Sequence, residues 1–138
     1  MKNNNVFVID TNTLISASLL KKSVARQAFD KAMERGIIAV SHATLNEFSD
    51  TFVRSKFDRY LPLEVRLEII ERFKSMSCLV NPKVKIDVCR DSKDNQFLEL
   101  AISCNAKYII SSDADLLVLN PYQNINIVSP RQFLEELF

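Results

Sequence analysis

The amino-acid sequence predicts a single α/β domain in which helices cover both faces of a central, mostly parallel sheet. Short apolar runs alternate with longer segments of helical periodicity, the order expected of βαβ units. The 138 residues suit one domain, and a content of 47% hydrophobic and 25% charged residues is typical of globular chains. Right-handed crossovers would build a three-layer α/β/α structure over residues 1–138.

The first half of the chain alternates two apolar runs with three helical segments. Strands are expected over residues 6–9 and 37–40, and helices over residues 23–35, 41–55 and 62–77. Ser23 is suited to cap the first of these helices, and Gly36, the only glycine, to end it at the C′ position. Pro62 suits the first position of the third helix, where a missing N–H costs nothing.

The second half continues the alternation with shorter elements. Strands or extended segments are expected over residues 78–80, 84–88, 108–110 and 125–128, and helices over residues 92–104, 114–119 and from 129 onward. Ser92 is suited to cap the first of these helices, and Asn105 to stop it in a left-handed conformation.

Composition excludes several classes of protein. The net charge of +1 gives no overall field toward nucleic acid or an anionic membrane, so phosphate binding must be local. The first ten residues lack the apolar run of a signal peptide, and no segment approaches the length of a membrane helix. Cys78, Cys89 and Cys104 lack metal-site spacing, so we expect reduced, buried thiols in a cytoplasmic protein.

Acidic residues gather where the expected strands and helices meet. Asp10 and Asp113 each follow a buried strand, and open parallel sheets bind ligands beyond the carboxyl ends of their strands. The alternative is that each caps the helix after it. Asp94 lies in the first turn of its helix, at the end of the buried stripe. Its carboxylate either belongs to the site at the rim of the sheet or interacts favourably with the helix dipole. Asp115 is expected to support Asp113, whereas a helical wheel places Glu47 in solvent.

Several carboxylates without a histidine or cysteine partner offer the hard oxygen ligands that suit Mg²⁺ or Mn²⁺. This donor set favours metal-assisted phosphodiester hydrolysis. A single glycine excludes dinucleotide and P-loop motifs, and His42 has no nucleophile motif around it. Residues 10–13 also resemble the aspartate loop of haloacid-dehalogenase phosphatases, but Asn12 replaces the second aspartate. A metal-dependent phosphatase is therefore the minor alternative.

Taken together, these residues resemble the PIN-domain (PilT N-terminus) ribonucleases, and most closely the VapC-like toxins of bacterial toxin–antitoxin pairs. The resemblance runs from about Val6 to Leu137, and the order and spacing of its motifs are specific. It is carried by segments 8–12, 14–16, 41–47, 54–57, 90–95, 113–117, 129–130 and 133–134.

The resemblance implies a Mg²⁺- or Mn²⁺-dependent endoribonuclease that acts on single-stranded RNA and has a cognate antitoxin. The implied catalytic and metal-binding acids are Asp10, Glu47, Asp94 and Asp113, with Asp115 as a further metal ligand. Against the helical wheel, it brings Glu47 into the site. Asn12 and the Ser111 hydroxyl would position water or substrate. Ser92 departs from the family's usual proline, and Ser111 and Ser112 replace its usual Thr-Gly.

Basic residues near the acids are candidates for contacts with the RNA backbone. They are Lys21, Lys22, Arg26, Arg54, Lys56, Arg59, Arg90 and Lys93. Arg90 and Lys93 are favoured as substrate-positioning residues because they flank Asp94, while about half of the set is expected on solvated helix faces. The rival hypothesis is a PIN-like protein-binding scaffold with weak or no catalysis, although a scaffold has no reason to retain four acids. Apolar helical faces would permit a homodimer.

Overall fold

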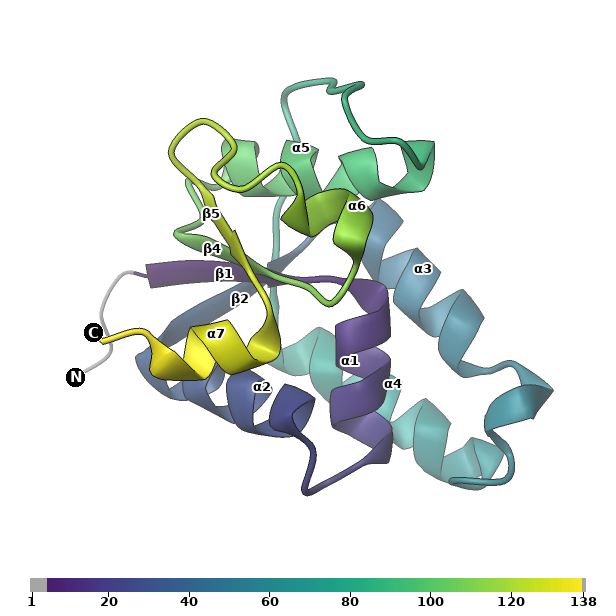
Figure 1. The fold of residues 1–138 in the computed structure, drawn as a ribbon. Coiled ribbons are helices and arrows are strands. Elements are labelled where there is room, and N and C mark those ends of the chain that lie inside the picture. The colour runs from purple at the N-terminus through teal and green to yellow at the C-terminus, as the bar shows by residue number, and fades with distance from the viewer. Residues whose placement is uncertain (1–4, 138) are drawn as a thin grey trace.

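The computed structural model describes residues 5–137, which contain five parallel strands in one sheet of order β3-β2-β1-β4-β5 (Figure 1). Residues 1–4, the start of the segment judged unlike a signal peptide, lie outside this range. The strands are β1 Asn5–Ile9, β2 Gly36–Val40, β3 Cys78–Leu79, β4 Tyr108–Ile110 and β5 Asn126–Val128. The expected α/β fold is confirmed, and all neighbouring strands pair in parallel.

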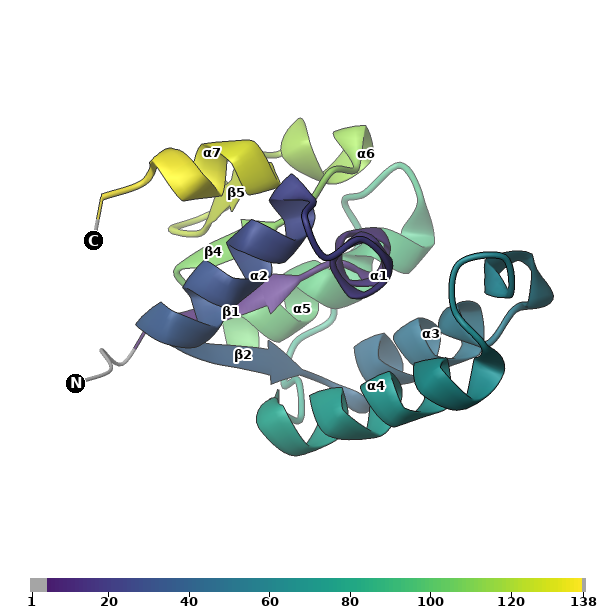
Figure 2. The same ribbon diagram turned by 90° about the horizontal axis from the view of Figure 1, so that it is seen from below.

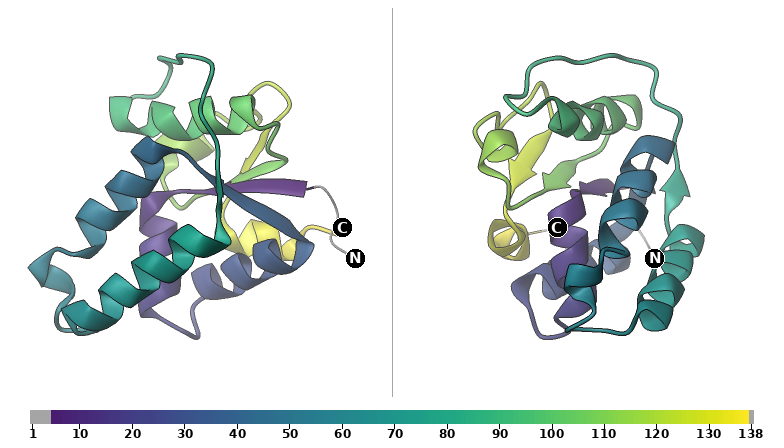
Figure 3. Two further views of the ribbon diagram at one scale, coloured as in Figure 1. Left: turned by 180° about the vertical axis from the view of Figure 1, so that it is seen from behind. Right: turned by 90° about the vertical axis from the view of Figure 1, so that its right-hand side faces the viewer.

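The described residues also contain seven α-helices and two 3₁₀ helices. They are α1 Thr11–Leu19, α2 Val24–Arg35, α3 His42–Phe52, η1 Ser55–Phe57, α4 Leu63–Met76, η2 Ser92–Asp94, α5 Asn95–Ser103, α6 Ala114–Leu117 and α7 Pro130–Glu135. Helices α5 and α6 lie on one face of the sheet, and α1, α2 and α7 lie on the other (Figures 1 and 2). Helices α3 and α4 run side by side as an arm (Figure 3). None of the described helices is long and apolar enough to cross a membrane.

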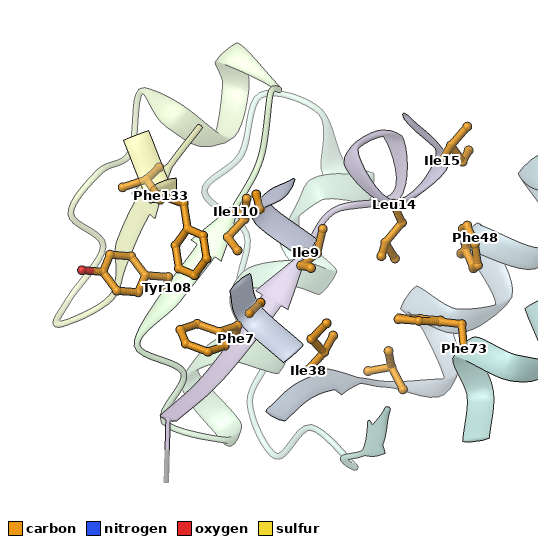
Figure 4. Packing of buried hydrophobic residues seen from close by; sticks show 14 of the residues in the cluster. Phe7, Ile9, Leu14, Ile15, Ile38, Phe48, Phe73, Tyr108, Ile110 and Phe133 are labelled. Atoms are coloured by element: carbon orange, nitrogen blue, oxygen red, sulfur yellow. The ribbon is translucent and has the colours of Figure 1, made fainter. Parts of the chain in front are cut away.

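Strand side chains alternate between two hydrophobic cores. In β1, Phe7 and Ile9 enter the core beneath α1 and α2, whereas Val8 enters the core beneath α5. Phe133 of α7 packs edge-on against Phe7, with ring centroids 5.3 Å apart (Figure 4). Because both faces of the sheet are apolar and covered, polar chemistry is confined to the ends of the strands.

Gly36 ends α2, as expected, but it is the C-cap and not the C′ residue, with its N–H donating to the Ala32 carbonyl. It is also the first residue of β2, and its φ of 179° is extended backbone and not the left-handed conformation. A Cβ at this position would lie 2.2 Å from the carbonyl oxygen of Asn5, its partner in β1. The glycine is therefore required by the close approach of two strands.

Two expected helix starts also differ. Pro62 is the N-cap of α4 and not its first residue. Ser92 does not cap the next helix, because the carboxylate of Asp91 accepts the hydrogen bond from the Lys93 N–H at 3.1 Å. By contrast, Asn105 has a φ of 53°, which confirms the left-handed stop.

Residues 84–88 form no strand, although their side chains alternate. Their backbone N–H groups bond to side chains of α5 and not to another strand: Ile86 donates to Glu99 at 3.0 Å, and Val88 donates to Asn95 at 3.1 Å. All three cysteines are free, as expected, but Cys78 is exposed and the other two are only partly buried. The expectation of buried thiols was therefore wrong for Cys78, which lies on the edge strand β3.

Candidate active site

The carboxyl ends of β1 and β4 bring two acidic loops together, because these strands pair with Ile9 opposite Ile110. The Ser111 hydroxyl donates a hydrogen bond to the Asp10 carboxylate and accepts one from the Asp113 N–H at 2.9 Å. Ser111 is fully buried. Its side chain therefore holds the two acids in place and does not line the pocket from which substrate would approach.

Asp10 caps the helix that follows it and also lies at the rim of the sheet. Its carboxylate accepts a hydrogen bond from the Thr13 N–H at 3.0 Å and so caps α1, and its side chain also lines the acidic pocket. Only 4% of the residue is exposed. Burial raises the pKa of Asp10, hydrogen bonds from Ser111 and Thr13 oppose that effect, and the charge of Asp113 adds to it.

Asp94 lies at the junction of η2 and α5 with 9% of its surface exposed. Among the described residues its Oδ2 is buried and has no hydrogen-bond partner. Burial, followed by the neighbouring carboxylate of Asp113, raises the pKa of Asp94 to about 7. An unpartnered buried carboxylate oxygen costs free energy, which a cation bound at this position would recover.

Carboxylate oxygens of Asp94, Asp113 and Asp115 lie within 4.8 Å of one another. Asp113 caps the short helix α6 by accepting from the Asp115 N–H at 2.9 Å, which sets the spacing of the two acids. Together with the unpartnered oxygen of Asp94, this all-oxygen donor set fits a hard divalent cation. Arg90 is 86% exposed and forms an ion pair with Asp115 at 3.0 Å, so its guanidinium lies at the edge of the cluster.

Glu47 is half-buried, so the helical-wheel expectation of a solvent-exposed side chain was wrong. One carboxylate oxygen accepts from the Thr11 hydroxyl, and the other accepts from the Gln96 amide at 2.8 Å. Helix α3 packs against both α1 and α5, which turns its polar side toward the rim of the sheet. Thr11 and Gln96 were missed in the sequence because their role depends on contacts between separate helices.

A pocket of about 230 Å³ collects these side chains at the rim. Of the residues singled out from the sequence, it is lined by Asp10, Asn12, Glu47, Arg54, Lys93, Asp94 and Asp113. Thr11, Thr51, Asp91 and Phe97 complete the wall. The pocket therefore unites the four core acids with two basic side chains.

Comparison with known proteins agrees with this architecture. The PIN domain family model matches residues 6–115. The uncharacterized protein MJ1680 of Methanocaldococcus jannaschii is 35% identical over 139 residues, which covers 94% of this chain and 89% of the relative.

Two solved structures have a similar fold. PAE2754 from Pyrobaculum aerophilum superposes with a TM-score of 0.64 at 13% identity, covering 97% of this chain and 90% of that one. VapBC2 from Rickettsia felis, determined with a DNA fragment from its promoter, gives a TM-score of 0.59 at 13% identity, covering 88% of this chain and 98% of that one. These likenesses concern the fold, and the family match covers most of the sequence. The chain therefore belongs to the PIN-domain family.

Proposed function

We propose that the protein is a divalent-metal-dependent endoribonuclease that hydrolyses phosphodiester bonds of single-stranded RNA. The observation that carries this proposal is the clustering of carboxylate oxygens from Asp94, Asp113 and Asp115 within 4.8 Å, in a PIN-domain chain. The buried, unpartnered oxygen of Asp94 supports it, since that atom has a ligand position to fill.

Asp94, Asp113 and Asp115 are the residues that would hold Mg²⁺ or Mn²⁺. A bound ion supplies charge neutralisation at the phosphate and a more acidic water. Asp10 contributes a fourth carboxylate, whose orientation is set by Ser111 and Thr13.

Other side chains of the pocket complete the proposed mechanism. Glu47 is held by Thr11 and Gln96, so its carboxylate can receive a proton without first reorienting. Asn12 and Lys93 line the same wall and offer hydrogen-bond donors to substrate. Arg90, which is bound to Asp115, would contact RNA only at the outer edge of the site.

The state of Asp10 argues against the alternative of a phosphatase with an aspartate nucleophile. Each of its two carboxylate oxygens accepts a hydrogen bond, one from Ser111 and one from Thr13, and the side chain is almost fully buried. A nucleophile must instead present an oxygen to the phosphorus atom, and only 4% of Asp10 is exposed. Hydrolysis by water is the reaction that this geometry favours.

We propose further that the protein is the toxin of a toxin–antitoxin pair, inhibited by a cognate antitoxin. The structural likeness to VapBC2 from Rickettsia felis supports this assignment. Co-purification with the product of the adjacent reading frame, followed by loss of RNA cleavage in the complex, is the expected result. Full activity in a stable complex would contradict inhibition.

Cleavage of a fluorescent single-stranded RNA by the purified protein tests the enzymatic proposal. Activity should require Mg²⁺ or Mn²⁺, stop with excess chelator and return when metal is restored. Asp94→Asn should lower the rate by at least about 100-fold, because it removes a charged ligand. Asp50→Asn, an equal charge change at an exposed position on α3, is the matched control. Cleavage that persists in excess chelator would exclude the metal mechanism.

A further inference from the structure

Arg66 of α4 is fully buried, which is unusual for a charged side chain. Its Nε donates to the Leu61 carbonyl at 3.0 Å, and its Nη1 donates to the carbonyls of Phe52 and Arg54 at 2.7 and 3.1 Å. Its Nη2 pairs with the Asp58 carboxylate. Leu61, Arg54 and Asp58 lie in the connection between α3 and α4, and Phe52 is the last residue of α3 before it. The guanidinium therefore acts as the internal support of that connection.

This arrangement explains how the charge can be buried. A desolvated guanidinium is costly unless a counter-ion and hydrogen-bond acceptors surround it. The carbonyl of Phe52, the last residue of α3, belongs to the negative end of the helix dipole, and Asp58 supplies a full negative charge. Removing the guanidinium would leave these carbonyls without a hydrogen-bond donor, so Arg66 confines the connection to one conformation.

The connection carries three basic side chains, and they have different surroundings. The Lys56 ammonium lies 5.1 Å from the centre of the Phe57 ring, and the Arg59 guanidinium lies 5.3 Å from that of Tyr60. Only Arg54 of the three lines the acidic pocket. Within residues 5–137 its side chain forms no ion pair, although carboxylates line the same pocket.

The helical repeat places two residues of α3 in the pocket wall: Glu47 and Thr51, spaced at i and i+4. Arg54 lies two residues beyond the end of α3 in extended backbone, and the connection brings it to the same pocket. A phosphodiester approaching several carboxylates is repelled, and the net charge of the molecule offers no general attraction to offset this. An unpaired guanidinium in the wall supplies that attraction locally and matches the geometry of phosphate oxygens.

We propose that Arg54 binds a backbone phosphate of the substrate RNA in the acidic pocket, and that Arg66 is the positioning residue that sets Arg54 through its backbone carbonyl. This inference rests on the proposed ribonuclease function and adds a phosphate anchor to it. The anchor comes from the α3–α4 connection, and Lys93 of η2 is the pocket's other basic side chain.

Equilibrium binding of a fluorescent single-stranded RNA, measured by anisotropy over a range of salt concentrations, tests the role of Arg54. The Asp94→Asn background keeps the RNA intact. Adding Arg54→Gln should weaken binding several-fold and reduce the slope of log K against log salt by about 0.7, the value for one phosphate contact with a single strand. Arg72→Gln makes the same charge change at an exposed position on α4 and should leave the slope unchanged.

The role of Arg66 is tested by combining its substitution with that of Arg54 in a double-mutant cycle. A loss of folding in the Arg66 variant alone would not show that Arg66 positions Arg54. Arg66→Lys keeps the charge but cannot form the fork, and it should reproduce most of the loss caused by Arg54→Gln. Arg54→Gln should then add little to Arg66→Lys, and additive losses would refute positioning. If circular dichroism shows that Arg66→Lys does not fold, Asp58→Ala provides the same test, since the Asp58 side chain is 61% exposed.

The outcomes separate the two proposals. A wild-type protein that neither binds nor cleaves RNA would overturn the ribonuclease function and, with it, the phosphate anchor. A wild-type protein that does both, with Arg54→Gln indistinguishable from Arg72→Gln, would overturn only the assignment of Arg54.

Discussion

Replacing Asp94 with asparagine should stabilise the metal-free protein while it removes activity. Asp94 is buried, one of its oxygens has no hydrogen-bond partner among the described residues, and Asp113 lies beside it. Asparagine has nearly the same shape, carries no charge and can donate a hydrogen bond to a neighbouring carboxylate. The substitution therefore removes repulsion without opening a cavity.

The size and sign of the effect follow from the pKa of Asp94. Burial, and then Asp113, raises this pKa from 3.8 to about 7. Between these values the folded protein binds more protons than the unfolded chain, so stability falls as pH rises from about 4 to about 7 and then levels off. At about 1.4 kcal/mol per pKa unit the upper limit is about 4 kcal/mol. Solvent screening at the open rim reduces the expected gain for Asp94→Asn to about 1–2 kcal/mol.

Urea unfolding in the presence of EDTA, at several pH values from about 4 to 8, measures this gain. The two proteins should have nearly equal stability near pH 4, and the variant should become the more stable as pH approaches 7. Asp50→Asn controls for the change in net charge, because Asp50 is exposed. A gain that does not grow with pH, or a less stable variant at neutral pH, would refute the reasoning.

Three further predictions concern the site and the sheet. Mg²⁺ or Mn²⁺ at 100 times Kd should stabilise the wild type by about 2.7 kcal/mol and so raise its Tm. In scanning fluorimetry the Tm of Asp113→Asn should rise much less, and equal rises would mean that Asp113 is not a ligand. Ser111→Ala should cost about 1–3 kcal/mol in denaturant titrations and slow RNA cleavage, because it unpairs the Asp10 carboxylate and the Asp113 N–H; unchanged values of both would contradict the role of Ser111. Gly36→Ala should lower Tm, since its Cβ would meet the Asn5 carbonyl, whereas a rise would show that unfolded-state entropy outweighs the clash.

Local sequence patterns were sufficient to predict the α/β class, most element positions and three acids of the candidate site, Asp10, Asp94 and Asp113; Glu47 was placed there only by the family resemblance. Short-range rules apply to such features: Ser23 caps α2 as expected, and Asn105 takes the left-handed conformation that its place after a helix favours. Asp10 and Asp113 could be placed at one rim because parallel strands end at the same edge of a sheet. Each of these inferences needs only the neighbouring residues and the geometry of a repeating backbone.

Tertiary structure alone decided how the acids are held and which basic side chains line the pocket. The bond from Ser111 to Asp10 spans 101 residues, and Gln96 and Thr11 reach Glu47 across 49 and 36 residues. A helical wheel reports only which side of an element is apolar, so it placed Glu47 in solvent when two neighbouring helices cover it. Arginine likewise usually lies on the protein surface, and only the packing of α3 on α4 buries Arg66. Such contacts depend on how separate elements meet, which no local period encodes.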